Sequence, residues 1–250
     1  MGKRAVETRM LDSALALASR LFVAVIPVAL LVSSFLPGGQ TFAERLVTGL
    51  QLQGAGRLAA ERLFATPDVV RAGMTVATCL VGAWSLMSCG GVLQRSYRSA
   101  WRLETLGSGS WRRDAGRRLL WAAGLVVYVG ATFGLADVSA HGVVAIVRDG
   151  ARIALALAFF SWGPYVVLGR QVAPRRLLPT AIAAAVALGA VAAVAPLYLP
   201  EVASASARSY GLVGFAFAFL TWLFVQALLI VGAAVAGAVI GERVGHRDRG

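Results

Sequence analysis

The sequence predicts an all-α polytopic membrane protein with six transmembrane helices and both termini in the cytoplasm. Two observations lead to this fold class. First, 58% of the 250 residues are hydrophobic and only 14% are charged, whereas ordinary soluble domains contain about 25% charged residues. Second, the charged residues divide the chain into long uncharged runs, and a helix needs about 20 such residues to cross a bilayer. Because lipid offers no hydrogen-bond partners, each run must satisfy its own backbone as a helix.

These uncharged runs set the boundaries of the predicted spans. They cover residues 14–36, 72–94, 119–136, 153–169, 177–200 and 209–241, and together they form one membrane domain over residues 1–250. No run alternates polar and apolar residues, which excludes a porin-like barrel. We expect the first span to remain uncleaved, because no small-residue cleavage site follows its apolar stretch at once.

The distribution of basic residues predicts the orientation. The formal net charge is +12, and Lys3 is the sole lysine. With the termini in the cytoplasm, 17 of the 24 lysine and arginine residues face the cytoplasm and seven face outward, in agreement with the positive-inside rule. The charge excess is therefore an orientation signal, and we expect no nucleic-acid partner.

The outer segment between the first two spans is predicted to contain an amphipathic helix. Pro37, Gly38 and Gly39 form a turn signal. Apolar residues then recur at helical spacing at Phe42, Leu46, Leu50, Leu58 and Leu63. We interpret this pattern as one or two helices that cap the bundle, in preference to a lipid sensor or gate.

The titratable residues do not form a catalytic pattern. The 12 acidic residues are scattered, and none lies at mid-membrane depth. Cys79 and Cys89 are expected to be small buried hydrophobic residues, and the two histidines lack metal-ligand spacing. No phosphate-binding or dinucleotide-binding motif is present. The sequence therefore predicts neither an enzyme nor a cofactor or metal site.

Three residues inside the spans are candidates for a cavity or substrate contact: Arg20, Pro27 and Gln226. Arg20 either extends to the cytoplasmic headgroups or faces a cavity and binds an anionic group. The amide of Gln226 must find a partner, so it either links helices or lines a substrate path. Pro27 removes a backbone hydrogen bond and can kink the first span.

A basic, aromatic segment follows the second span. Tryptophan and tyrosine beside arginine suit the level of anionic headgroups. The candidates for headgroup contact are Arg95, Tyr97, Arg98, Trp101 and Arg102.

The last span is rich in small residues. We expect helix packing at Gly211, Gly214, Gly232, Gly237 and Gly241. Gly237 and Gly241 have the spacing that lets two helices approach closely. This packing is interpreted as internal to the bundle, with contact between two copies of the chain as the alternative.

Several stretches resemble the YihY/virulence factor BrkB family. Residues 91–101 (GVLQRSYRSAW) are similar to the family's segment after the second span, and residues 209–214 (SYGLVG) to its entry into the sixth. The similarity extends over about residues 10–242 and includes Pro27, Trp222 and the stretches 173–179 and 229–233. Arg98 stands where the family often has asparagine, and Ala18, Ser19 and Arg20 replace its serine-rich entry to the first span.

The resemblance implies a bacterial inner-membrane protein with six helices and cytoplasmic termini. It also implies transport or handling of a lipid or other envelope component, with anionic lipid headgroups as partners. The alternative is a non-transporting scaffold that binds itself or another envelope protein through its last span and outer helix. A ribonuclease, the family's former label, is disfavoured because no acid constellation supports it. No ATP-binding motif is present, so transport driven by hydrolysis needs a partner protein.

Overall fold

The computed structural model describes residues 2–35, 42–64, 76–101, 103, 111–136 and 143–247, and this part of the chain is helical without strands. The all-α prediction is therefore confirmed. The helices are α1 (Gly2–Phe35), α2 (Phe42–Gly49), α3 (Gly54–Leu63), α5 (Val76–Ala100), α6 (Trp111–Ala136), α7 (Val143–Val167) and α8 (Pro174–Arg247).

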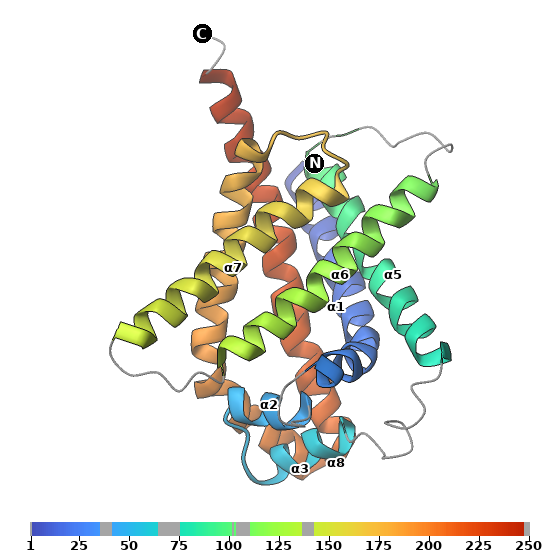
Figure 1. The fold of residues 1–250 in the computed structure, drawn as a ribbon, viewed down its shortest axis with the longest axis vertical. Coiled ribbons are helices and arrows are strands. Elements are labelled where there is room, and N and C mark those ends of the chain that lie inside the picture. The colour runs from blue at the N-terminus through green and yellow to red at the C-terminus, as the bar shows by residue number, and fades with distance from the viewer. Residues whose placement is uncertain are drawn as a thin grey trace.

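The long helix α8 is a hairpin of two antiparallel arms (Figure 1). Gly211 breaks it with φ 62° and ψ −141°, a conformation that favours glycine because a Cβ would be strained there. We call residues 174–210 the first arm and residues 212–247 the second arm. The chain reverses between them, since Gly237 of the second arm lies against Thr180 of the first.

The six long segments alternate in direction: α1, α5, α6, α7 and the two arms of α8 (Figure 1). α1 runs antiparallel to the second arm, because the Phe22 ring packs 6.4 Å from that of Phe219 and Met10 lies beside Gly232. α1 therefore begins where the second arm finishes. We call this the terminus end of the bundle, and the opposite end, where Gly211 turns, the hairpin end.

The short helices α2 and α3 cover the hairpin end (Figure 1). The Phe42 ring packs edge-on against Phe64 and Phe133, at 5.4 Å in each case. Ser204 of the first arm donates a hydrogen bond of 2.9 Å to the Gln53 carbonyl. The predicted outer helix is thus two helices packed on the bundle. Leu58, expected on the apolar face, is instead 58% exposed.

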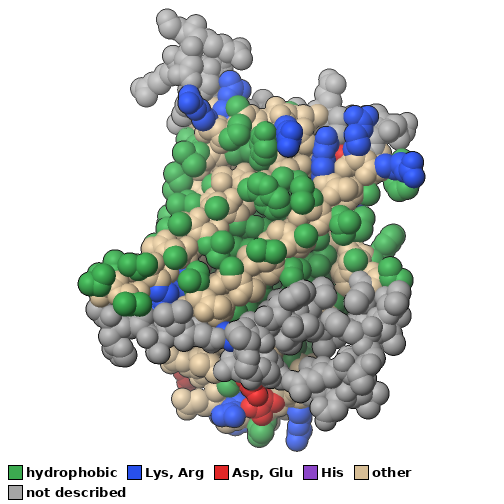
Figure 2. Space-filling model, viewed as in Figure 1, with side chains coloured by type: hydrophobic (Ala, Val, Ile, Leu, Met, Phe, Trp, Pro, Cys, Tyr) green, Lys and Arg blue, Asp and Glu red, His purple; other side chains and the backbone are tan. Residues whose placement is uncertain are grey.

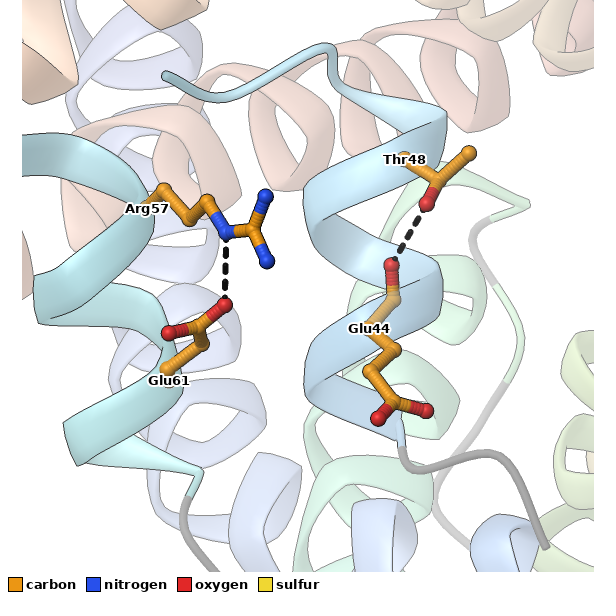
Figure 3. Close-up of polar contacts among 4 residues, drawn as sticks. All are labelled: Glu44, Thr48, Arg57 and Glu61. Atoms are coloured by element: carbon orange, nitrogen blue, oxygen red, sulfur yellow. Dashed lines mark hydrogen bonds and ion pairs between the residues drawn. The ribbon is translucent and has the colours of Figure 1, made fainter. Parts of the chain in front are cut away.

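Two further polar contacts of α2 and α3 are local (Figure 3). Arg57 Nε lies 2.7 Å from Glu61 Oε1, one helical turn away. The Thr48 hydroxyl donates to the Glu44 carbonyl at 2.9 Å. These contacts support the two short helices and do not converge on a shared site.

Within the described residues, two helices are long and apolar enough to cross a membrane: Trp111–Leu135 and Pro174–Gly241. The second covers 68 residues, far more than the roughly 20 that one crossing needs, and Gly211 divides it into the two arms. Apolar side chains also cover much of the surface between the two ends, and basic side chains gather at the terminus end (Figure 2). Leu197, for example, is 80% exposed. Such a surface is typical of a protein that contacts lipid.

Candidate functional site

Arg20 lies near the middle of α1 and is held between α1 and α5. Its Nη1 atom donates hydrogen bonds to the Ser88 carbonyl at 3.1 Å and to the Ser88 hydroxyl at 2.6 Å. The side chain is half-buried. The charge that interrupts the first span is therefore directed at a neighbouring helix.

Arg118 reaches α5 from α6. Its Nε atom donates a 2.9 Å hydrogen bond to Gln94 Oε1. The guanidinium lies over Gly91, where an added Cβ would be 3.3 Å from Arg118 Nη1. Glycine at this position therefore leaves room for the arginine. Gln94 is 3% exposed, and its Nε2 donor has no hydrogen-bond partner within the described part of the chain.

Arg95 completes a group that we call the arginine cluster, formed by Arg20, Arg95 and Arg118. Arg95 is exposed. The pKa of Arg95 is lowered, mainly because the side chain is partly buried and further because Arg20 and Arg118 are positively charged. Among the described residues, no carboxylate forms an ion pair with the cluster. The neighbouring Arg117, in contrast, pairs with Asp114 at 3.2 Å.

The predicted headgroup contacts of Tyr97 and Arg98 need correction. Tyr97 is 1% exposed and belongs to the core, and Arg98 is 9% exposed. Side chains two residues apart on a helix point in directions that differ by about 200°. Arg95 therefore faces outward while Tyr97 faces the bundle. Trp101 is half-buried with its ring near Gly241, and Arg102 lies outside the described residues.

Arg20, Pro27 and Gln226 do not gather around one cavity. Pro27 is buried at the closest approach of α1 and α5, where a Cβ on Gly82 would lie 2.6 Å from Pro27 Cβ. Arg20 also faces α5. Gln226 is half-buried on the second arm. None of the three lines the groove described next.

A groove of about 780 Å³ lies between the two arms of α8. Its walls come from residues 190–210 of the first arm and residues 213–225 of the second, and every lining side chain is uncharged. The few polar groups are the hydroxyls of Tyr198, Ser206, Tyr210 and Thr221 and the Trp222 indole. The apolar sequence of both arms does not distinguish a groove from a packed interface, so the groove was not predicted.

Glycines explain why the arms separate only in their middle. At the hairpin end, a Cβ on Gly214 would overlap the Ser206 carbonyl oxygen. Toward the terminus end, a Cβ on Gly237 would overlap the Thr180 hydroxyl, and one on Gly241 would lie 2.7 Å from the Trp101 ring. The two arms are thus in close contact near each end. The groove lies between the arms in the part of α8 that separates these two contacts.

These contacts also refine the glycine predictions. Gly214, Gly237 and Gly241 pack within the bundle, as the internal interpretation expected. An added Cβ on Gly232 would meet the Met10 methyl at 3.8 Å, and one on Gly211, which forms the turn, would meet no atom of the described residues within 4 Å. The glycine surface suggested for a scaffold partner is therefore largely occupied by the chain's own helices.

A comparison with known families identifies the chain over its full length. The model of the family described as "Virulence factor BrkB" matches residues 1–250. No curated protein and no solved structure matches the chain significantly. The family match agrees with the resemblance seen in residues 91–101 and 209–214, and with the apolar, exposed helices of a membrane protein. The chain belongs to the virulence factor BrkB family.

Proposed function

We propose that this chain is a six-pass protein of the bacterial cytoplasmic membrane that binds and transports lipid, with the terminus end in the cytoplasm. The groove between the arms of α8 carries this proposal. The alternating direction of the six segments and the basic terminus end support the orientation.

The groove has the properties that a lipid acyl chain requires. Its volume of about 780 Å³ falls in the range of about 300–1,000 Å³ that is usual for ligand sites. Its lining carries no charge, so an acyl chain would displace no strongly hydrated group. Tyr210 lies next to the Gly211 turn, is 76% exposed, and suits the outer headgroup level. A lipid in the outer leaflet would thus place its chain between the arms.

The orientation predicts which residues can be labelled from outside. In a variant whose Cys79 and Cys89 are replaced by alanine, we expect a membrane-impermeant maleimide to modify Arg57→Cys in intact spheroplasts. Arg57 lies on α3 at the hairpin end with its side chain 61% exposed. Arg112→Cys, exposed at the start of α6, should react only after lysis. Labelling of Arg112→Cys alone in intact spheroplasts would show the opposite orientation.

Filling the groove should stop lipid transport. We expect a deletion strain to show an altered distribution of envelope lipids that wild-type protein restores and Val194→Trp does not. Val194 lines the groove, and an indole there would occupy the space of an acyl chain. Leu197→Trp is the matched control, because Leu197 is 80% exposed on the same arm and lies outside the groove.

Lipid mass spectrometry of separated inner and outer membranes provides the measurement, with immunoblots to match protein levels. Full restoration by Val194→Trp, or a lipid profile unaffected by the deletion, would refute lipid transport through the groove.

A further inference from the structure

We propose that the arginine cluster, together with Ser88 and Gln94, forms a binding site for the phosphate of an anionic lipid headgroup, with Arg95 and Arg118 toward the terminus end. The identity of the ligand as a lipid rests on the proposed function. The site itself rests on separate residues of α1, α5 and α6, away from the groove.

The first argument is the convergence of donors on one stretch of α5. Arg20 reaches Ser88 from α1, and Arg118 reaches Gln94 from α6. A guanidinium offers five N–H donors, and among the described residues Arg118 donates a hydrogen bond only from its Nε. Its Nη1 atom lies beside Gly91, where the absence of a side chain leaves room for the guanidinium against α5. Guanidinium groups with free donors suit phosphate oxygens, which they bind in pairs.

The second argument is the unused donor of Gln94. Its Oε1 accepts from Arg118, while its Nε2 is buried without a hydrogen-bond partner among the described residues. A buried donor without a partner costs about 1–3 kcal/mol. A phosphate oxygen beside Arg118 would accept from both groups.

The third argument is uncompensated charge. Arg20 and Arg118 act on Arg95 strongly enough to lower its pKa, in addition to the effect of burial. Neighbouring Arg117 has Asp114 as a partner, but no described carboxylate pairs with the three cluster residues. An anion at this position would remove the mutual repulsion of three positive charges.

The location favours a lipid over a free anion. Arg95 is exposed, so the cluster opens to the outside of the bundle. Trp111, at the start of α6, is 71% exposed at the same end, as expected for a side chain at the headgroup level. In the proposed orientation this level is the cytoplasmic leaflet, where anionic lipids attract basic side chains.

Binding to the full-length protein in detergent micelles tests this site. Native mass spectrometry would measure the retention of dioleoylphosphatidic acid, dioleoylphosphatidylcholine and inorganic phosphate by the same samples. We expect phosphatidic acid to bind best and Arg118→Gln to weaken its binding about tenfold, since a charge-assisted hydrogen bond contributes that much. Arg95→Gln should also weaken binding, and because the Arg95 side chain is exposed, this change should leave folding intact.

Arg112→Gln is the matched control. It removes one positive charge from an exposed position on α6, where Arg112 only stacks on Trp111 at 5.9 Å. Binding should therefore change less than about twofold. If Arg112→Gln and Arg118→Gln weakened phosphatidic acid binding equally, the effect would come from the overall positive charge, and the proposed site would be wrong.

Two further outcomes are decisive. Inorganic phosphate that binds as tightly as phosphatidic acid would overturn the assignment to a lipid. If Arg118→Gln and Arg95→Gln left phosphatidic acid binding unchanged, the proposed site would be refuted. Val194→Trp would still test transport through the groove. The two proposals therefore fail independently.

Discussion

Replacing Gly237 with alanine should destabilise the protein by about 3 kcal/mol, because a new side chain in a closely packed position forces the backbones apart. The added Cβ would overlap the Thr180 hydroxyl and lie 2.6 Å from Thr180 Cα. Thr180 is fully buried, so neither its backbone nor its side chain has room to withdraw. The two arms of α8 would have to separate at the level that pins the groove.

Gly232→Ala is the control for this substitution. Gly232 lies in the same arm, and its nearest neighbour is the flexible Met10 methyl at 3.8 Å. Alanine should be neutral there or stabilise the helix by about 0.5–1 kcal/mol, through its lower conformational entropy in the unfolded state. Thermal unfolding in detergent micelles would compare the variants. If Gly237→Ala were as stable as Gly232→Ala, the arms would not pack as described.

Replacing Arg45 with methionine should destabilise the hairpin end by about 2 kcal/mol, within the range for hydrogen bonds made by charged groups. Arg45 is 5% exposed on α2, and its Nη1 donates a 2.9 Å hydrogen bond to the Phe133 carbonyl. Phe133 lies in the last turn of α6, where carbonyls lack partners within the helix. Methionine retains much of the apolar stem but leaves this carbonyl without its donor.

Arg57→Met tests whether any arginine at the hairpin end has this effect. Arg57 is exposed on α3 and pairs with Glu61 one turn away (Figure 3). An exposed pair of this kind contributes about 0.3–0.5 kcal/mol. Hydrogen exchange of α2 and α6 would locate the loss in Arg45→Met. Equal protection in the two variants would contradict a specific role for the Arg45–Phe133 bond.

The sequence predicted the helical class because charges interrupt apolar runs near helix ends. The run at 119–136 and helix α6 both end at residue 136, for example. Other boundaries depended on backbone geometry that composition does not reveal. Glu201 and Arg208 indicated a loop between the last two spans, yet residues up to 210 are helical and Gly211 alone breaks the helix. The sequence alone does not show whether a glycine forms a turn, as Gly211 does, or lets two helices pack closely, as Gly237 does.

The candidate site was harder to predict because its partners come from distant segments. Arg20 was identified as an unusual charge, but its partner Ser88 lies on another helix and carries no sequence signal. Tyr97 and Arg95 were assigned together because they are close in sequence, although helical rotation places them on opposite faces. Arg118 was counted as one of several loop arginines, and only its contact with Gln94 sets it apart.

The pairing of α1 with the second arm of α8 has a consequence for biosynthesis. The Phe22–Phe219 contact joins α1 to the second arm of α8, which is synthesised much later, so α1 enters the membrane before this partner exists. During that interval its closest described neighbour is α5, with Arg20 bound to Ser88 and Pro27 seated on Gly82. Assembly of the bundle therefore waits for the second arm, and a ribosome that stalls before residue 212 leaves the face of α1 that contacts this arm open to lipid and to quality-control proteases.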